Sequence, residues 1–161
     1  MAQLENLLRL LNAYKVRYVI IGAAAFVAHG WFRATRDLDL FVANDDENLV
    51  RLRKALSEFG YDLSDATTED FKKYKILFRQ YDFPLDIHPM VKGASSFEGV
   101  WKRRKASTIG NVLTNFVSLT DLISMKRAAG RPKDRIDLEQ LRKLQRKNSK
   151  KGKKRSRPRS N

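Results

Sequence analysis

Short strand-type runs are interleaved with amphipathic helical stretches along the chain, and this pattern limits the fold more than any other feature. "RYVIIG", "RDLDLFVA" and "FPLDIHPM" are apolar segments of strand length. The first helical stretch has its leucines at i, i+3, i+4 and i+7: Leu4, Leu7, Leu8 and Leu11. Because strands and helices mix without strict alternation, we expect an α/β (α+β) fold with a mixed β-sheet flanked by helices.

The end of this pattern predicts a C-terminal helical pair. "SLTDLISMKRAAG" begins with Ser118 and Asp121 at capping-box spacing and closes with Gly130, which is typical of a well-bounded helix. Pro132 suits the first position of a second helix. The apolar set of that helix is Ile136, Leu138, Leu141 and Leu144.

The net charge of +15 is concentrated at the C-terminal end. Residues 142–161 hold eleven of the 33 Lys and Arg residues and no Asp or Glu. A segment without apolar residues cannot build a core, so we expect one domain over 1–146 and a disordered basic tail over 147–161. The tail is either an electrostatic arm for RNA or DNA or a solubilising terminus.

Several classes of protein are excluded or disfavoured. The chain has no cysteine, so disulfides, thiolate metal sites and a cysteine nucleophile are excluded. Its longest apolar run is shorter than the roughly 20 residues that span a bilayer. The N-terminus lacks the features of a signal peptide. We therefore expect a soluble cytoplasmic protein.

Two aspartates, Asp37 and Asp39, lie in a segment that otherwise reads as a buried strand. Residues i and i+2 of a strand face the same side, so their carboxylates need a partner there. Three interpretations are open. Arg33 and Arg36 could neutralise a solvated face, a divalent cation such as Mg²⁺ could bind both carboxylates, or the two could form a general acid/base pair.

Two further features favour the metal. Gly22 stands between a strand and a helix, where backbone N–H groups can bind phosphate oxygens. Asp86 lies in the apolar strand "FPLDIHPM" and is the best third carboxylate. His88 has the same register as Asp86, although a strand histidine is more often packed than a metal ligand. Three carboxylates beside a phosphate-binding turn are typical of two-metal phosphoryl chemistry.

Together these residues resemble the DNA polymerase β-like nucleotidyltransferase superfamily. Its members have a Gly-Gly or Gly-Ser turn, then a strand with Asp-x-Asp, then a later strand with one more Asp. The corresponding residues are Gly22 and Ala23, the pair Asp37 and Asp39, and Asp86. Residues 20–42 and 119–141 resemble a small prokaryotic subgroup associated with toxin–antitoxin systems. Ala23 departs from the pattern, because alanine offers the phosphate no hydroxyl and adds a methyl group.

The resemblance implies transfer of a nucleoside monophosphate from an NTP to an acceptor hydroxyl. Asp37, Asp39 and Asp86 would be catalytic and would bind two Mg²⁺ ions. The nucleotide would contact Gly22, Ala23, Arg33, Thr35, Arg36 and Lys126. The acceptor could be a tRNA or other RNA end, a protein or a small molecule. The alternative is a catalytically degenerate binding module, one component of a toxin–antitoxin pair, that binds nucleic acid or a partner protein.

Overall fold

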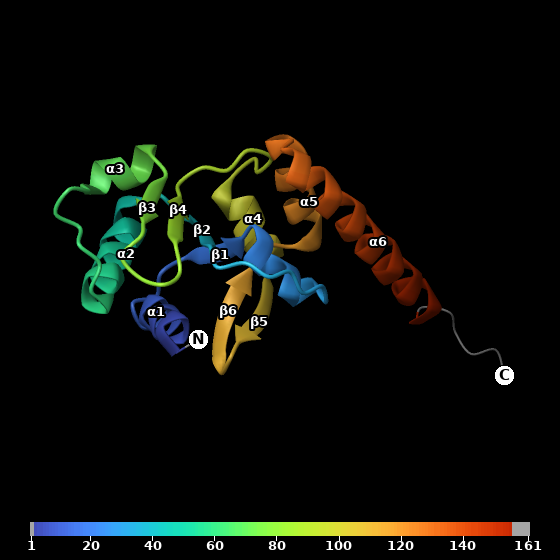
Figure 1. Ribbon diagram of the computed structural model, residues 1–161, viewed down its shortest axis with the longest axis horizontal. Helices are drawn as coiled ribbons and strands as arrows, with labels where there is room; N and C mark the ends of the chain where they lie inside the picture. The colour runs from blue at the N-terminus through green and yellow to red at the C-terminus, as the bar shows by residue number, and fades with distance from the viewer. Residues whose placement is uncertain (1, 156–161) are drawn as a thin grey trace.

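The computed structural model describes residues 2–155, with side chains up to Lys151 (Figure 1). The strands in this range are β1 (Tyr18–Ile21), β2 (Leu38–Val42), β3 (Ile76–Phe78), β4 (Leu85–His88), β5 (Lys105–Ile109) and β6 (Val112–Phe116). The helices are α1 (Ala2–Ala13), α2 (Asp46–Phe59), α3 (Thr68–Lys73), α4 (Phe97–Arg103), α5 (Leu119–Ala129) and α6 (Pro132–Arg155), with a 3₁₀ helix η1 (Ala23–His29).

The strands form one sheet in the order β3-β4-β2-β1-β6-β5. β2 runs parallel to β4 and β1 runs parallel to β6, whereas the pairs β1–β2, β3–β4 and β5–β6 are antiparallel. Helices flank this sheet, and α5 packs on α6. The predicted mixed sheet and C-terminal helical pair are therefore confirmed.

The helices occupy two regions of the molecule. Figure 1 shows α1, α2 and α3 at one end of the sheet, and α5 and α6 at the other, with the far end of α6 projecting from the body. Nearly all residues of the central strands β1, β2 and β4 are buried together with the apolar helix faces in one core, which includes Leu11, Leu40, Leu56, Phe71 and Phe116. A cavity lies between the central strands and the α5–α6 pair.

Helix η1 ends at Gly30 and helix α5 ends at Gly130, as the sequence predicts for α5. Gly30 and Gly130 adopt the left-handed conformation and donate their N–H groups to carbonyls of the last turn. Ser118 caps the start of α5 by accepting a hydrogen bond from the N–H of Asp121. These ends fix where the β1–η1 turn and the α5–α6 junction lie.

Two boundaries differ from the prediction. β2 begins at Leu38, so Asp37 precedes the strand, because its N–H donates to Thr35 Oγ1 and not to the ladder. α6 continues to Arg155, beyond the predicted domain end at 146, because Lys, Arg and Gln are strong helix formers and extend a helix that is already packed. The predicted tail over 147–161 therefore begins as helix, and its part over 156–161 lies outside the described residues. In the part of the chain that the structure describes, no helix is long and apolar enough to cross a membrane.

Candidate functional site

Three neighbouring strands bring Gly22, Asp39 and Asp86 together. Ile21 at the end of β1 pairs with Asp39 of β2, and Asp39 pairs with Asp86 of β4 in the parallel ladder. Leu38 and Leu40 alternate with Asp39 and are buried in the core. The two carboxylates therefore project from the same face of the sheet, on adjacent strands.

Gly22 lies against the Asp39 carboxylate. Its φ of 68° and ψ of −155° belong to a region of backbone conformation that residues other than glycine rarely adopt. A Cβ at this position would lie 2.6 Å from Asp39 Oδ2. Only glycine gives both this turn and this close approach, so the residue after β1 and the carboxylate on β2 are structurally coupled.

His88 completes a group of three with Asp39 and Asp86. Its Nε2 donates a hydrogen bond of 2.8 Å to Asp39 Oδ1. One oxygen of each carboxylate and one nitrogen of the imidazole all lie within 4.8 Å of one another, which is close enough to bind one metal ion. The alternation of β4 places His88 on the same face as Asp86, two residues earlier.

Two cations neutralise Asp86, which is only 7% exposed. Lys75 Nζ lies 2.5 Å from one carboxylate oxygen, and Arg79 donates to the other at 2.8 Å. Burial on its own raises the pKa of Asp86, but hydrogen bonds from Lys75 and Arg79 outweigh burial and lower the pKa below its usual value. Asp86 is therefore ionised at neutral pH.

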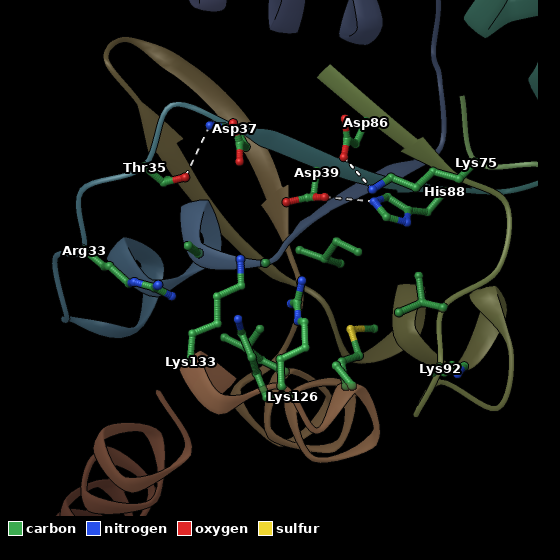
Figure 2. Close-up of a pocket in the computed structure, with 18 of the residues that line it drawn as sticks. Arg33, Thr35, Asp37, Asp39, Lys75, Asp86, His88, Lys92, Lys126 and Lys133 are labelled. Atoms are coloured by element: carbon green, nitrogen blue, oxygen red, sulfur yellow. Dashed lines mark hydrogen bonds and ion pairs between the residues drawn. The ribbon is translucent and has the colours of Figure 1, made fainter. Parts of the chain in front are cut away.

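These groups line a cavity of about 670 Å³, which is within the range of roughly 300–1,000 Å³ typical of small-molecule sites. Figure 2 shows Asp37, Asp39 and Asp86 on the strand side, with Lys126 and Lys133 facing them from the α5–α6 pair. The basic residues that line the cavity are Arg33, Lys75, Lys92, Lys126, Arg131 and Lys133. The cavity thus combines a carboxylate wall with a cationic wall.

Ion pairs with buried aspartates fix the position of the cationic wall. Lys126 Nζ lies 2.9 Å from Asp134 and 3.0 Å from Asp137, and all three residues are buried. Arg131 also pairs with Asp134 at 2.6 Å, and Arg33 pairs with Asp137 at 2.5 Å. Burial raises the pKa of Asp134, but hydrogen bonds from Arg131 and Lys126 outweigh it and lower the pKa to about 2.

Most of the residues singled out from the sequence lie around this cavity. Its lining includes Gly22, Ala23, Arg33, Thr35, Asp37, Asp39, Asp86 and Lys126. Arg36 is exposed and is not part of the lining. Asp37 lies at the rim and is not in the group of three ligand atoms, whereas His88 is. Asp37 lies just before β2 and Asp39 within it, and both line the cavity.

Comparison with known proteins assigns the chain to a family. A family model described as a nucleotidyltransferase of unknown function (DUF6036) matches residues 1–151. The chain belongs to this nucleotidyltransferase family. Its substrate is therefore a nucleotide, and the paired acids offer the metal site that such enzymes usually need. None of the curated proteins compared with the chain gives a match.

Sequence reasoning missed part of the cavity lining. Lys75, in the segment before β3, contacts Asp86, and no local sequence pattern predicts that contact. Arg131 and Lys133 also line the cavity, and no sequence pattern singled them out as site residues. His88 carried a usable signal, because its two-residue spacing from Asp86 predicts a shared strand face.

Proposed function

We propose that the protein transfers a nucleoside monophosphate from an NTP to an acceptor hydroxyl and releases pyrophosphate. The observation that carries the proposal is the in-register pair of Asp39 and Asp86, facing a cationic wall across one cavity. Carboxylates suit a divalent cation, and the cationic wall suits a triphosphate. The family assignment supports the same reaction class.

The donor set fits Mg²⁺, which prefers oxygen ligands. We assign Asp39 and Asp86 as the residues that would bind it, with Asp37 as a further carboxylate at the rim. When bound, Mg²⁺ neutralises triphosphate charge and stabilises charge that develops during phosphoryl transfer. Nitrogen is a poor ligand for Mg²⁺, so we assign to His88 the positioning of Asp39 through its hydrogen bond.

The chain's other residues bind and orient the nucleotide. Gly22 and Ala23 line the cavity at the start of η1, and we assign to their backbone N–H groups the contact with phosphate oxygens. Lys133 lines the cavity and has no carboxylate partner among the described residues, so it is the first choice for a triphosphate contact. Arg33 and Arg131 are assigned the same triphosphate contact. Ion pairs with Asp137 and Asp134 fix the positions of their guanidinium groups. Lys126 is held by two aspartates and positions this wall.

In the reaction, the acceptor oxygen forms a bond to the α-phosphorus of the NTP. The bond between that phosphorus and the oxygen bridging to the β-phosphate breaks, and pyrophosphate leaves with the electron pair. The acceptor proton passes to solvent water, because the low pKa of Asp86 makes its carboxylate a weak final base.

Labelled NTPs test this reaction. Wild-type protein with Mg²⁺, α-labelled NTPs and cell lysate should label an acceptor, whereas Asp39→Asn and Asp86→Asn should each lose at least about a hundredfold in rate. Asp65→Asn, an exposed acid outside the cavity, is the matched control and should behave as wild type. Transfer that survives both cavity substitutions contradicts the metal assignment. NTP-dependent thermal stabilisation without transfer by any variant would favour the binding module.

We further propose association with a partner protein, as in the toxin–antitoxin-associated members that residues 20–42 and 119–141 resemble. The edge strand β3 supports this proposal, because Tyr74 and Leu77 on and beside it are more than half exposed. Leu77→Lys should release a co-purifying partner, whereas Leu113→Lys, at an even more exposed position on β6, should not.

A further inference from the structure

Helix α6 carries basic residues on one side from the cavity to its exposed end. Lys133 lines the cavity, and Lys143, Lys147 and Lys151 follow on the same side of the helix. All four side chains are exposed. At about 1.5 Å per residue, this basic face extends roughly 27 Å from the cavity.

The neighbouring side of α6 is used for packing. Leu138 and Leu141 are buried and Leu144 is half-buried, and α6 contacts α5 there. The basic face lies beside this packed side, and its four lysines are exposed. Its lysines have no salt-bridge partner in the described range, and Glu139 is the one acid of the segment from Leu138 to Lys151.

The amino-acid composition of the basic face indicates which class of ligand it binds. After Leu144, α6 has no apolar residue up to Arg155, so it lacks the apolar centre on which protein interfaces depend. A row of unpaired positive charges instead suits a row of phosphates, because each contact releases condensed counterions. Figure 1 shows that this part of the helix stands clear of the sheet, so a long ligand can lie along it.

An exposed aromatic residue lies where the basic face meets the cavity. Phe32 is 79% exposed and precedes Arg33, whose guanidinium contacts Asp137 of α6 at 2.5 Å. That ion pair places the Phe32 backbone beside the second turn of α6. An exposed phenyl ring is a surface on which a base can stack.

We propose that the acceptor of the nucleotidyl group is a polynucleotide whose backbone lies along the basic face of α6 and whose terminal hydroxyl enters the cavity. The inference rests on the proposed transfer reaction and adds its substrate class. The terminal oxygen forms the new bond to the α-phosphorus, the bond from that phosphorus to the bridging oxygen breaks, pyrophosphate leaves, and the hydroxyl proton goes to water. Phe32 stacks on a base near the terminus.

Binding is tested with full-length protein and fluorescent single-stranded RNA and DNA pools of random sequence, measured by anisotropy at several salt concentrations. The triple variant Lys143→Gln/Lys147→Gln/Lys151→Gln should lower the slope of log K against log salt by about 2, as expected for three lost phosphate contacts. The matched control Lys15→Gln/Lys54→Gln/Lys102→Gln removes three exposed charges elsewhere and should leave the slope unchanged. Equal changes in both variants would overturn the proposal, since binding would then reflect net charge alone.

Further arms of this experiment separate the ligands. Tighter binding of RNA than of DNA would identify RNA, through its 2′-hydroxyls, and the reverse would identify DNA. Polyglutamate that displaces RNA at equal charge concentration would overturn the proposal in favour of an acidic protein. Phe32→Ala should weaken binding about tenfold at an unchanged salt slope, whereas the exposed control Leu113→Ala should not weaken it.

Transfer is tested with the same pools and α-labelled NTPs. Label should appear on oligonucleotides with a free 3′-hydroxyl, disappear when that end is blocked, and fall in the triple variant at low oligonucleotide concentration. NTP-dependent thermal stabilisation is measured in parallel. Stabilisation by NTP with no label on either pool, but label on a protein, would overturn the polynucleotide inference and leave the proposed function intact. Loss of both signals would contradict the proposed function itself.

Discussion

The carboxylate wall of the cavity belongs to the strands and is called the strand wall, and the part of the cationic wall on α5 and α6 is called the helix wall. These two walls are held in place by different interactions. On the strand wall, Asp39 and Asp86 are neighbours because β2 and β4 pair in register, and backbone hydrogen bonds maintain that pairing. On the helix wall, Lys126 is placed by side-chain ion pairs with two buried acids, Asp134 and Asp137. The strand wall can therefore lose a charge and keep its geometry, whereas the helix wall cannot.

This difference separates chemistry from stability within one site. On the strand wall, the half-buried Asp39 carboxylate contributes mainly to the reaction, because its backbone position does not depend on its charge. The buried charges on the helix wall contribute to the folded state as well, because removing one leaves its buried partners with fewer opposite charges. Substitutions on the strand wall should accordingly lower the transfer rate, and substitutions on the helix wall should lower the free energy of unfolding.

The largest effect on stability is expected for Lys126→Met. Methionine keeps most of the volume but leaves Asp134 and Asp137 buried with only Arg131 and Arg33 as partners. Breaking a buried pair in this way should reduce the free energy of unfolding by about 3 kcal/mol, measured by urea denaturation. Asp39→Asn should change it by less than about 1 kcal/mol.

Lys54→Met is the matched control for Lys126→Met, because Lys54 is exposed on α2. Its effect should stay within about 0.5 kcal/mol. Equal stability losses in Lys126→Met and Asp39→Asn would mean that the two walls are not held differently, and the comparison would fail.

Gly22→Ala should combine a smaller stability loss with a large loss of transfer. The positive φ costs about 1–3 kcal/mol for alanine, and the added Cβ would lie 2.6 Å from Asp39 Oδ2. Because that oxygen ends a side chain, the overlap is relieved by rotation of the carboxylate, which removes it from the site. Transfer rate and urea denaturation measure the two effects.

Gly30→Ala controls for backbone strain, since Gly30 also has a positive φ but its Cβ would meet nothing within 4 Å. It should lose stability and keep its transfer rate. If both glycine variants lose transfer equally, strain in η1 and not displacement of Asp39 is the cause.

The same division explains how much could be predicted from the sequence. The mixed sheet, the strand leucines and the likeness around Asp39 and Asp86 follow local periodicity and motif spacing, which one sequence displays. Asp37 lies outside β2 because pairing with β4 starts at Leu38 and pairing with β1 at Asp39, and the Asp37 N–H donates to Thr35 instead. The pairing of Lys126 with Asp134 and Asp137 depends on how α5 packs on α6, and that of Lys75 with Asp86 depends on how β3 joins β4. No periodicity within one segment carries such information.

His88 tests the strand wall at finer scale. His88→Ala removes the hydrogen bond to Asp39 and should weaken Mn²⁺ or Mg²⁺ binding about 10–100-fold, as measured by titration calorimetry. His88→Gln keeps an N–H donor of similar reach and should recover most of that affinity. Failure of glutamine to recover it, together with tighter binding of Zn²⁺ by wild type, would make His88 a metal ligand and not a positioning residue.

The smallest effect is expected from the pH dependence of the helix wall. Asp134 has a pKa of about 2 in the folded protein, below its ordinary value of 3.8, because Arg131 and Lys126 stabilise its ionised form more than burial disfavours it. A depressed folded-state pKa adds stability that is fully present above pH 3.8 and is lost as the pH falls to about 2. In urea denaturation across this window, wild type should therefore lose stability more steeply than Asp134→Asn, which is less stable at neutral pH but lacks this titration. Parallel pH profiles would show that Asp134 ionises alike in the folded and unfolded chains, and the helix wall would then owe its position to packing of α5 on α6 and not to its buried charges.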